Sequence, residues 1–430
     1  MDYRNIRKSQ GWIYNSIIPA IHLEYRMLFR KIYLHNRKGV QANKPVLIAS
    51  NHPTAFIDPI FFCIFFDPPV YNMTRGDIFR KPFYRKLMEH CNMFPVYRQR
   101  DGYEKRDRND EVFEYCQKKL LNGVAVNIFV EGEHHLDKRV LPIQKGIARI
   151  AFGTYENHPM DDLQIVPVGC NYIAGDIRRD EAKIIVGEAI YVKDYWEQYQ
   201  ANPNAAINAL CLDIRNALVS ICYNINDPAD DDFAEQLLML WRNDHAGTMI
   251  PVVEFQADRF FEEKKVLDRL NTMLPEAKGK LRAQTDTYFN ALASAKLKDE
   301  LLVQTEQGHW QWLLFFVLGF IPFILGSILR WPIRSLAQYV TKTVKPKREF
   351  NTSILMGVGA LSTFVFFIIL FLIGIIKGWP LLIAFVILLP LLTWFSIFWN
   401  ERLVHWRAAR FALQHPERER LLAMRKTIIY

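Results

Sequence analysis

Three uncharged apolar segments near the C-terminal end constrain the fold more than any other feature of this 430-residue sequence. They contain no Asp, Glu, Lys or Arg and cover residues 311–329, 352–376 and 378–399. An α-helix needs roughly 20 apolar residues to cross about 30 Å of hydrocarbon, and each segment approaches or exceeds that length. One such segment is compatible with a buried helix of a soluble protein, but three in close succession indicate an integral membrane protein. Residues 306–400 are therefore predicted to be embedded in a membrane.

The positions of Lys and Arg predict how these segments are oriented, because cytoplasmic loops of membrane proteins are enriched in positive charge. The connection 330–350 carries six Lys or Arg residues against one Glu, whereas the connection between the second and third segments offers only Lys377. We therefore expect 352–376 and 378–399 to form a spanning hairpin. The connection 330–350 and the basic tail 401–430 would then lie on the cytoplasmic face of a bacterial inner membrane or of the endoplasmic reticulum.

The first apolar segment, 311–329, does not fit that hairpin as a third span. If the preceding part of the chain is also cytoplasmic, both ends of this segment lie on one side of the membrane. Pro322 stands near its middle, and a proline at such a position breaks a helix. We predict a re-entrant or in-plane element, with a true span as the alternative.

The formal net charge of +9 is concentrated at the two ends of the chain. Residues 11–35 repeat aliphatic side chains at three- and four-residue spacing and mix them with Arg and Lys, as amphipathic helices do. Residues 1–40 are therefore predicted to lie on a lipid surface, with an ordinary surface helix as the alternative. The apolar segments argue against a nucleic-acid-binding protein. Membrane lipids are the expected partners, and nucleic acid is not.

Neither the six cysteines nor the histidines form a metal-binding pattern. The cysteines are scattered, without metal-ligand or redox spacing, which is typical of free thiols in a reducing compartment. His134 and His135 are adjacent, but no third ligand stands at a usual spacing from them. No metal and no cofactor are expected.

Residues 41–195 alternate short β-rich apolar runs with helix-like stretches, which is typical of an α/β domain with a mostly parallel sheet. The expected strands are 46–50, 70–74, 93–97, 124–130, 163–168 and 183–187, and the expected helices are 59–66, 83–91, 108–122 and 143–157. Residues 196–305 lack β-rich runs and are rich in Ala, Leu, Glu and Lys, which predicts a helical region. The predicted fold is therefore an α/β domain followed by a helical region and C-terminal membrane helices.

The stretch VLIASNHPTAFIDP, residues 46–59, places a histidine and an aspartate at the end of the first of these strands. Asp58-Pro59 is typical of a helix start, because proline suits the first turn and aspartate caps free N–H groups. His52 then lies at the carboxyl edge of the sheet, where α/β proteins bind ligands. If the loop 53–57 folds back, Asp58 orients His52, whose other ring nitrogen can take a proton from a hydroxyl. Taken singly, a capping aspartate and a buried core histidine are the alternatives.

The segment SNHPTAFIDP resembles the first signature block of the glycerolipid acyltransferase (PlsC-type) superfamily, whose members acylate glycerol-3-phosphate and lysophospholipids. Three further blocks follow in the family's order, over about residues 41–195. They are MTRGDIFRKPF with NMFPVYR, NIFVEGEHHLDKRVLPIQKGIARIAF, and IVPVGCNY. This resemblance implies an α/β acyltransferase domain acting on a glycerolipid.

Two departures from the commoner motifs resemble one branch, the fungal-type glycerol-3-phosphate/dihydroxyacetone-phosphate acyltransferases and their bacterial relatives. The aspartate stands one position further from the histidine, and Val130 takes the place of the commoner proline before Glu131. The branch also has a histidine at the place of His135, and a Leu-Pro followed by a Gly, as in Leu141-Pro142 and Gly146. A helical region and C-terminal membrane segments accompany it.

The resemblance implies acyl transfer from acyl-CoA or acyl-carrier protein to glycerol-3-phosphate, with His52 as general base and Asp58 as its partner. It implies that Arg98 holds the acceptor phosphate, since a guanidinium makes paired, charge-assisted hydrogen bonds. The remaining candidates for acceptor binding are Glu131, Gly132 and His135, with Arg75 and Lys145 as weaker basic candidates. A lysophospholipid acceptor is the alternative within the enzyme class, and a catalytically silent membrane scaffold is the alternative outside it.

Overall fold

The computed structural model describes most of the chain, in two compact units. The described residues are 12–41, 43–67, 70–76, 79, 81–96, 108–303 and 310–430. The first unit runs to Asn224 and also contains Ile250–Ala257 and Lys347–Ser353. The second unit consists of Ile225–Met249, Asp258–Pro346 and Ile354–Tyr430.

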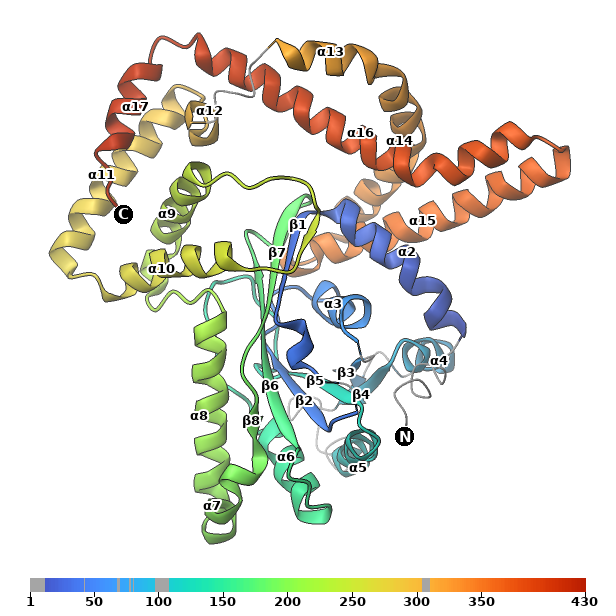
Figure 1. The fold of residues 1–430 in the computed structure, drawn as a ribbon, viewed down its shortest axis with the longest axis vertical. Helices are drawn as coiled ribbons and strands as arrows, with labels where there is room; N and C mark the ends of the chain where they lie inside the picture. The colour runs from blue at the N-terminus through green and yellow to red at the C-terminus, as the bar shows by residue number, and fades with distance from the viewer. Residues whose placement is uncertain are drawn as a thin grey trace. The chain divides into compact units, whose positions relative to one another are not determined.

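A nine-stranded sheet forms the centre of the first unit, as far as the described residues show, with the strand order β4-β3-β5-β2-β6-β7-β1-β9 and β8 beside β6 (Figure 1). The strands are β1 Phe29–His35, β2 Val46–Ser50, β3 Val70–Arg75, β4 Met93–Val96, β5 Ala125–Phe129, β6 Gln164–Tyr172, β7 Asp180–Val186, β8 Ile190–Tyr191 and β9 Val253–Glu254. Strand β6 pairs antiparallel with β7 and β8, and the other pairs are parallel. The predicted α/β domain with a mostly parallel sheet is confirmed.

The central strands are apolar on both sides because helices cover both faces of the sheet. Every residue of β2 and β6 is buried, as expected for strands that are covered on two faces. Figure 1 shows α3 on one side of these strands and α8 on the other. The helices of this unit are α2 Trp12–Leu28, α3 Ile57–Phe65, α4 Pro82–His90, α5 Arg108–Leu121, α6 Gly146–Asn157, α7 Trp196–Ala201 and α8 Pro203–Ile221.

The N-terminal helix is shorter than the sequence pattern predicts. The expected helix 11–35 ends at Leu28, and the chain continues as β1, which pairs in parallel with β7. The end of α2 belongs to the core, because Tyr25 is fully buried, packs edge-on against Phe61 at 4.9 Å and donates its hydroxyl to the Ile57 carbonyl at 2.8 Å. The α/β domain therefore begins before residue 41. The membrane-surface role of residues 1–40 remains a prediction.

The region 196–305 is helical, as predicted, with one exception. It contains α7, α8, α9 Asp231–Asp244, α10 Asp258–Thr272, α11 Pro275–Ser294 and α12 Asp299–Val303. The exception is β9, which returns to the sheet and pairs with β1. At this edge Lys31 is buried and forms an ion pair with Glu254 at 3.0 Å. A two-residue strand has no periodicity of its own, so β9 could not be predicted from a sequence pattern.

A buried ionic cluster stabilises the helices of the second unit. Asp299 is almost fully buried and accepts hydrogen bonds from Tyr288, Asn243 and Arg425. Arg425 also pairs with Asp244 at 2.8 Å. Because these residues come from α9, α11, α12 and the C-terminal helix α17 Arg418–Lys426, the cluster joins four helices. Removing one partner would leave an uncompensated buried charge.

Among the residues that the structure describes, two helices are long and apolar enough to cross a membrane. They are α15, Arg348–Lys377, with 30 residues, and α16, Pro380–Leu413, with 34 residues. The first apolar segment, 311–329, is bent by 51° between α13 Gln311–Leu318 and the first part of α14 Phe320–Val344, as in a broken span or a re-entrant loop. The membrane character predicted from the three apolar segments is thus supported, and the choice between span and re-entrant loop stays a prediction.

Three details of this region differ from the sequence interpretation. The break lies at Gly319, and Pro322 falls in the first turn of α14, where proline is tolerated because the first N–H groups have no helical partner. The connection 330–350 is helical up to Val344. The basic tail begins as a continuation of α16. Apolar length alone does not show where a helix ends once charged residues follow it.

We expect position 342 and the tail after residue 400 to be labelled from the same membrane side as the α/β domain, and position 377 from the opposite side. The physical reason is the excess of positive charge at both cytoplasmic positions. The measurement is labelling of single cysteines from each face of sealed vesicles, on a cysteine-free background. Labelling of position 342 from the side of position 377 would contradict the re-entrant prediction for 311–329 and leave three spans.

Candidate active site

Polar side chains gather where three neighbouring parallel strands end. Strand β2 lies between β5 and β6 and is parallel to both, so the three carboxyl ends meet at one edge of the sheet. His52 follows β2, Glu131 follows β5, and Tyr172 is the last residue of β6. This edge is the usual ligand-binding position of an open α/β sheet. The strand positions predicted from the sequence therefore place His52 as expected.

The loop between His52 and Asp58 folds back, and the two side chains form a pair. His52 Nδ1 lies 2.8 Å from Asp58 Oδ2. An ionised carboxylate only accepts hydrogen bonds, so this contact requires the proton on Nδ1 and leaves Nε2 as the acceptor. Helix α3 begins at Ile57, which places Asp58 in its first turn and not at the capping position. The pairing predicted from the sequence is present.

Asp58 is fully buried and is held by donors that the sequence analysis did not identify. Oδ2 also accepts from the Thr54 amide at 2.8 Å, and Oδ1 accepts from the Thr54 hydroxyl at 2.7 Å and the Tyr172 hydroxyl at 2.6 Å. A buried carboxylate is costly unless donors surround it, and these contacts satisfy both oxygens. The fourth signature block ends at Tyr172, and that position in the block was the indication of this residue that the sequence contained.

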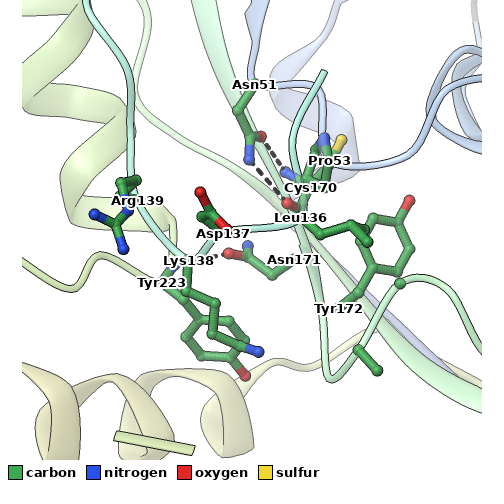
Figure 2. Close-up of a pocket in the computed structure, with 12 residues that line it drawn as sticks. Asn51, Pro53, Leu136, Asp137, Lys138, Arg139, Cys170, Asn171, Tyr172 and Tyr223 are labelled. Carbon is green, nitrogen blue, oxygen red and sulfur yellow. Dashed lines mark hydrogen bonds between the residues drawn. The ribbon is translucent and has the colours of Figure 1, made fainter. Parts of the chain in front are cut away.

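The His52 imidazole is held by stacking on its face, in addition to the contact of its edge with Asp58. Its ring stacks on Phe129, with ring centroids 3.7 Å apart and planes inclined by 13°. The preceding residue, Asn51, accepts from the Cys170 amide at 2.7 Å and donates to the Cys170 carbonyl at 3.0 Å, which joins the end of β2 to β6 (Figure 2). The backbone and the ring of the histidine are therefore both held in place. A fixed base needs little reorganisation when it takes up a proton.

Glu131 supports the loops of the site, and its predicted contact with the acceptor remains untested. Its side chain is fully buried. Oε1 accepts from the Leu141 amide at 2.9 Å, and Oε2 accepts from the His52 amide at 3.3 Å and lies 3.2 Å from His135 Nε2. With both oxygens engaged by protein donors, Glu131 positions the backbone of His52. Sequence reasoning missed the contact with the His52 amide because His52 stands 79 positions away along the chain.

The two adjacent histidines have different surroundings. Burial lowers the pKa of His135, but the neighbouring Glu131 carboxylate and Asp137 raise it more, so the net shift is upward. Burial lowers the pKa of His134, and the nearby His52 acts in the same direction. The His134 ring stands edge-on to His52, with centroids 5.7 Å apart. His135 is therefore a partner of Glu131, and His134 is a neutral neighbour of His52.

Gly132 allows the turn that follows β5. Its φ angle of 75° lies in the left-handed region, and a Cβ atom there would approach the Gln144 side chain to 3.2 Å. The Gly132 amide donates to the Phe129 carbonyl at 3.2 Å, so that amide is engaged within the turn. The structure thus gives Gly132 a conformational role, and its predicted contact with the acceptor remains untested.

The basic candidates are distributed unevenly around the site. Arg75 ends β3, one strand beyond β5, and its charge lowers the pKa of His134, which places it near the His52 edge. Lys145 is exposed at the start of α6. Arg98 lies outside the described residues. Arg75 is therefore the basic candidate that the structure brings toward the histidines.

A pocket adjoins the site on the side of Asn51 (Figure 2). Lys138 and Tyr223 line it, and the Lys138 ammonium donates to the Ile173 carbonyl at 2.6 Å. Neither His52 nor Asp58 is among its lining residues, so the pocket does not present the reacting groups. Within the part of the chain that the structure describes, no three His, Cys, Asp or Glu side chains are grouped so that they could hold a metal ion.

Comparison with known proteins identifies the domain that carries this site. Residues 31–171 match the family model described as Acyltransferase. Glycerol-3-phosphate O-acyltransferase 2 of Saccharomyces cerevisiae is 27% identical over 235 residues, which is 54% of this chain and 31% of that protein. Glycerol-3-phosphate O-acyltransferase 1 of the same yeast is 31% identical over 120 residues, 27% of this chain and 15% of that protein.

A third relative is an uncharacterized acyltransferase of Schizosaccharomyces pombe, 30% identical over 118 residues, 27% of this chain and 18% of that protein. The chain thus spans less than a third of the length of each of these relatives. The matched region contains β2, α3, β5 and most of β6, which together build the His52 edge.

Gly132→Ala is expected to lower the stability of the domain by about 1–2 kcal/mol, because a side chain at this left-handed φ angle is strained. Acyl transfer should fall with it, since the turn carries Glu131 and, through it, the His52 backbone. The control is Gly146→Ala, where a Cβ atom meets nothing within 4 Å at the start of a helix. Thermal denaturation of both variants measures the difference. Equal melting temperatures would contradict the conformational role of Gly132.

Proposed function

We propose that the chain transfers an acyl group from acyl-CoA or acyl-carrier protein to a hydroxyl of glycerol-3-phosphate. Residues 31–171 match the Acyltransferase family model, and the chain is similar to two yeast glycerol-3-phosphate O-acyltransferases, which supports a place in the glycerolipid acyltransferase (PlsC-type) superfamily. The observation that carries the proposal is the pair of His52 and Asp58 at the carboxyl edge of the sheet, 2.8 Å apart. The acceptor is inferred from the similarity to the two yeast glycerol-3-phosphate O-acyltransferases.

In this proposal His52 acts as the general base. Its Nε2 takes the proton from the acceptor hydroxyl while the hydroxyl oxygen attacks the thioester carbonyl. The new C–O bond forms, the C–S bond breaks, and the leaving thiolate receives the proton from the imidazolium. The buried Asp58 carboxylate holds the tautomer and stabilises the positive charge that develops on the ring. The products are the acylated glycerophosphate and the free thiol.

The surroundings of the site support a direct transfer without an acyl-enzyme. Cys170, whose backbone is bonded to Asn51, is buried, and burial raises the pKa of its thiol well above the usual range, which disfavours the nucleophilic thiolate. The Thr54 hydroxyl is also fully buried and donates to Asp58. Neither group is placed to attack a donor. The acceptor hydroxyl is then the nucleophile.

A phosphorylated acceptor needs a cationic contact, and Arg98 is the candidate from the resemblance. A guanidinium can form two parallel hydrogen bonds to a phosphate. Arg75, at the end of β3, adds positive charge on the same edge of the sheet. The long apolar helices support a membrane location for the protein. The excess of Lys and Arg in 330–350 and 401–430 is the reason for placing the catalytic domain on the cytoplasmic face in this proposal.

The decisive assay uses purified full-length protein in lipid nanodiscs with labelled palmitoyl-CoA. The acceptor panel contains glycerol-3-phosphate, dihydroxyacetone phosphate, lysophosphatidic acid and other lysophospholipids. Labelled lysophosphatidic acid as the main product supports the proposal. Turnover of a lysophospholipid alone would overturn the acceptor, and no turnover with any donor and acceptor would favour a silent scaffold.

His52→Ala is expected to reduce the rate of acyl transfer by about 10²–10⁴, the usual contribution of a general base. Asp58→Asn should also impair the rate, because an amide cannot accept all the hydrogen bonds that the carboxylate does. His90→Ala is the control, since His90 is exposed on α4. Rates are compared at equal protein concentration, among variants whose melting temperature matches that of the wild type. A His52→Ala variant that retains more than about a tenth of the rate would rule out this base.

Arg98→Ala is expected to raise the KM for glycerol-3-phosphate about ten- to hundredfold, with little change in the donor KM. Each lost hydrogen bond to a charged group is worth roughly 1.5–3 kcal/mol, and about 1.4 kcal/mol corresponds to a factor of ten. Arg98→Lys should recover part of the loss. Arg85→Ala, at an exposed position of α4, is the matched control. Equal increases in both KM values would reject Arg98 as the phosphate ligand.

A further inference from the structure

The segment Lys347–Ser353 belongs to the same compact unit as the sheet, although it lies far along the chain from it. It includes the first two turns of α15, one of the two helices long and apolar enough to cross a membrane. No signature block includes these residues. Their contacts in the first unit are made with the loop between His52 and Asp58, with His134, and with the turn after β6.

Residues 347–353 bind two backbone amides of the loop 53–57, which is called the catalytic loop below. The Thr54 amide donates to Asp58, but the next two amides find their acceptors elsewhere. The Ala55 amide donates to the Glu349 carbonyl at 3.4 Å, and the Phe56 amide donates to the Ser353 hydroxyl oxygen at 3.2 Å. Amides before a helix have no intrahelical acceptor, so they need an outside partner when they are shielded from water. For α3 that partner is the start of α15.

Ring contacts connect the same segment to the general base. Phe350 lies 6.2 Å from Phe56 and 4.7 Å from His134, edge-on to the latter with an interplanar angle of 86°. His134 in turn stands edge-on to His52 at 5.7 Å. The rings of Phe56, Phe350, His134 and His52 thus form a continuous row. A shift of Phe350 would be transmitted to the ring beside the base, because packed side chains leave little free space.

A third set of contacts fixes the segment to the turn that follows β6, the strand that carries Tyr172. Arg348 Nε lies 2.8 Å from Asp176 Oδ2, and the Asn351 amide group donates to the Asp176 carbonyl at 3.4 Å. The Arg348 side chain is mostly exposed, so this ion pair is screened by solvent and is the weaker attachment. Ser353, by contrast, is 5% exposed. The buried hydroxyl is therefore the contact whose loss should matter most.

We propose that three groups of this segment, the Glu349 carbonyl, the Phe350 ring and the Ser353 hydroxyl, form a positioning element of the active site, which holds the loop 53–57 in the conformation that pairs His52 with Asp58. Acyl transfer then depends on the contacts between the start of α15 and this loop. The assignment of the reaction rests on the proposed function, but the contact itself does not. Ser353 and Phe350 act through the loop and through His134, and neither is assigned a contact with substrate.

The test compares three variants at neighbouring positions in full-length protein. Ser353→Ala removes the acceptor of the Phe56 amide, and Ser353→Thr restores a hydroxyl. Thr352→Val is the matched control, because the Thr352 hydroxyl is buried in the same turn and has no hydrogen-bond partner among the described residues. A second, independent variant is Phe350→Ala. Two quantities are measured in nanodiscs: amide hydrogen exchange of the peptide containing residues 53–57, and the kcat and KM of acyl transfer.

In the Ser353→Ala variant we expect the amide hydrogens of residues 53–57 to exchange at least about tenfold faster, since the opening of the loop becomes easier. Its kcat should fall about tenfold while both KM values change by less than about twofold, as for a loss of alignment without a loss of binding. Phe350→Ala should act in the same direction. Ser353→Thr should recover most of the rate, and Thr352→Val should behave as the wild type in both measurements.

Wild-type exchange and wild-type kcat in Ser353→Ala would overturn the proposal. If amide exchange becomes faster while kcat is unchanged, Ser353 contacts the loop without a role in acyl transfer, and the proposal is also overturned. A fall in kcat that Thr352→Val shares would assign the effect to general helix packing and reject the positioning role. If the protein uses another acceptor, the same comparison is made with that acceptor, so failure of the proposed substrate and failure of this inference are separate results.

Discussion

The fold around the active site depends on the burial of one carboxylate. Asp58 has no exposed surface, and its two oxygens take hydrogen bonds from His52, Thr54 and Tyr172. A buried anion is strongly destabilising unless such donors converge on it, so the strand end, the loop and β6 must be in register at the same time. The need to satisfy Asp58 therefore selects the arrangement in which His52 is oriented.

A row of buried polar side chains just below the site enforces that register. The Ser50 hydroxyl donates to the Asn127 side chain at 2.8 Å, and Asn127 donates to Asn72 at 3.0 Å. These residues belong to β2, β5 and β3, and each is fully buried. A one-residue slip of any strand would leave a buried amide or hydroxyl without a partner, at a cost of about 1–3 kcal/mol for each group. Polar residues thus specify strand positions that apolar packing alone would not.

Much of this was predictable from local sequence, and the rest depended on distant partners. The strands near 46–50 and 124–130, and the pairing of His52 with Asp58, follow from short patterns within one segment. Strand β9 has only two residues, and its pairing with β1 joins positions more than 200 residues apart. The contact of Glu131 with the His52 amide joins positions 79 residues apart. Local periodicity contains no information about such contacts.

The relative size of two free energies decides what controls the catalytic loop. Moving an apolar helix such as α15 from water into hydrocarbon gains about 0.8 kcal/mol for each buried CH₂ group, tens of kcal/mol for the whole helix. A typical hydrogen bond, such as that between Phe56 and Ser353, contributes only about 0.5–1.5 kcal/mol net. The burial of apolar surface therefore decides the position of such a helix, and the weaker loop contacts adjust to it. In the proposed positioning role of Phe350 and Ser353, the conformation of the loop 53–57 would thus respond to the environment of α15.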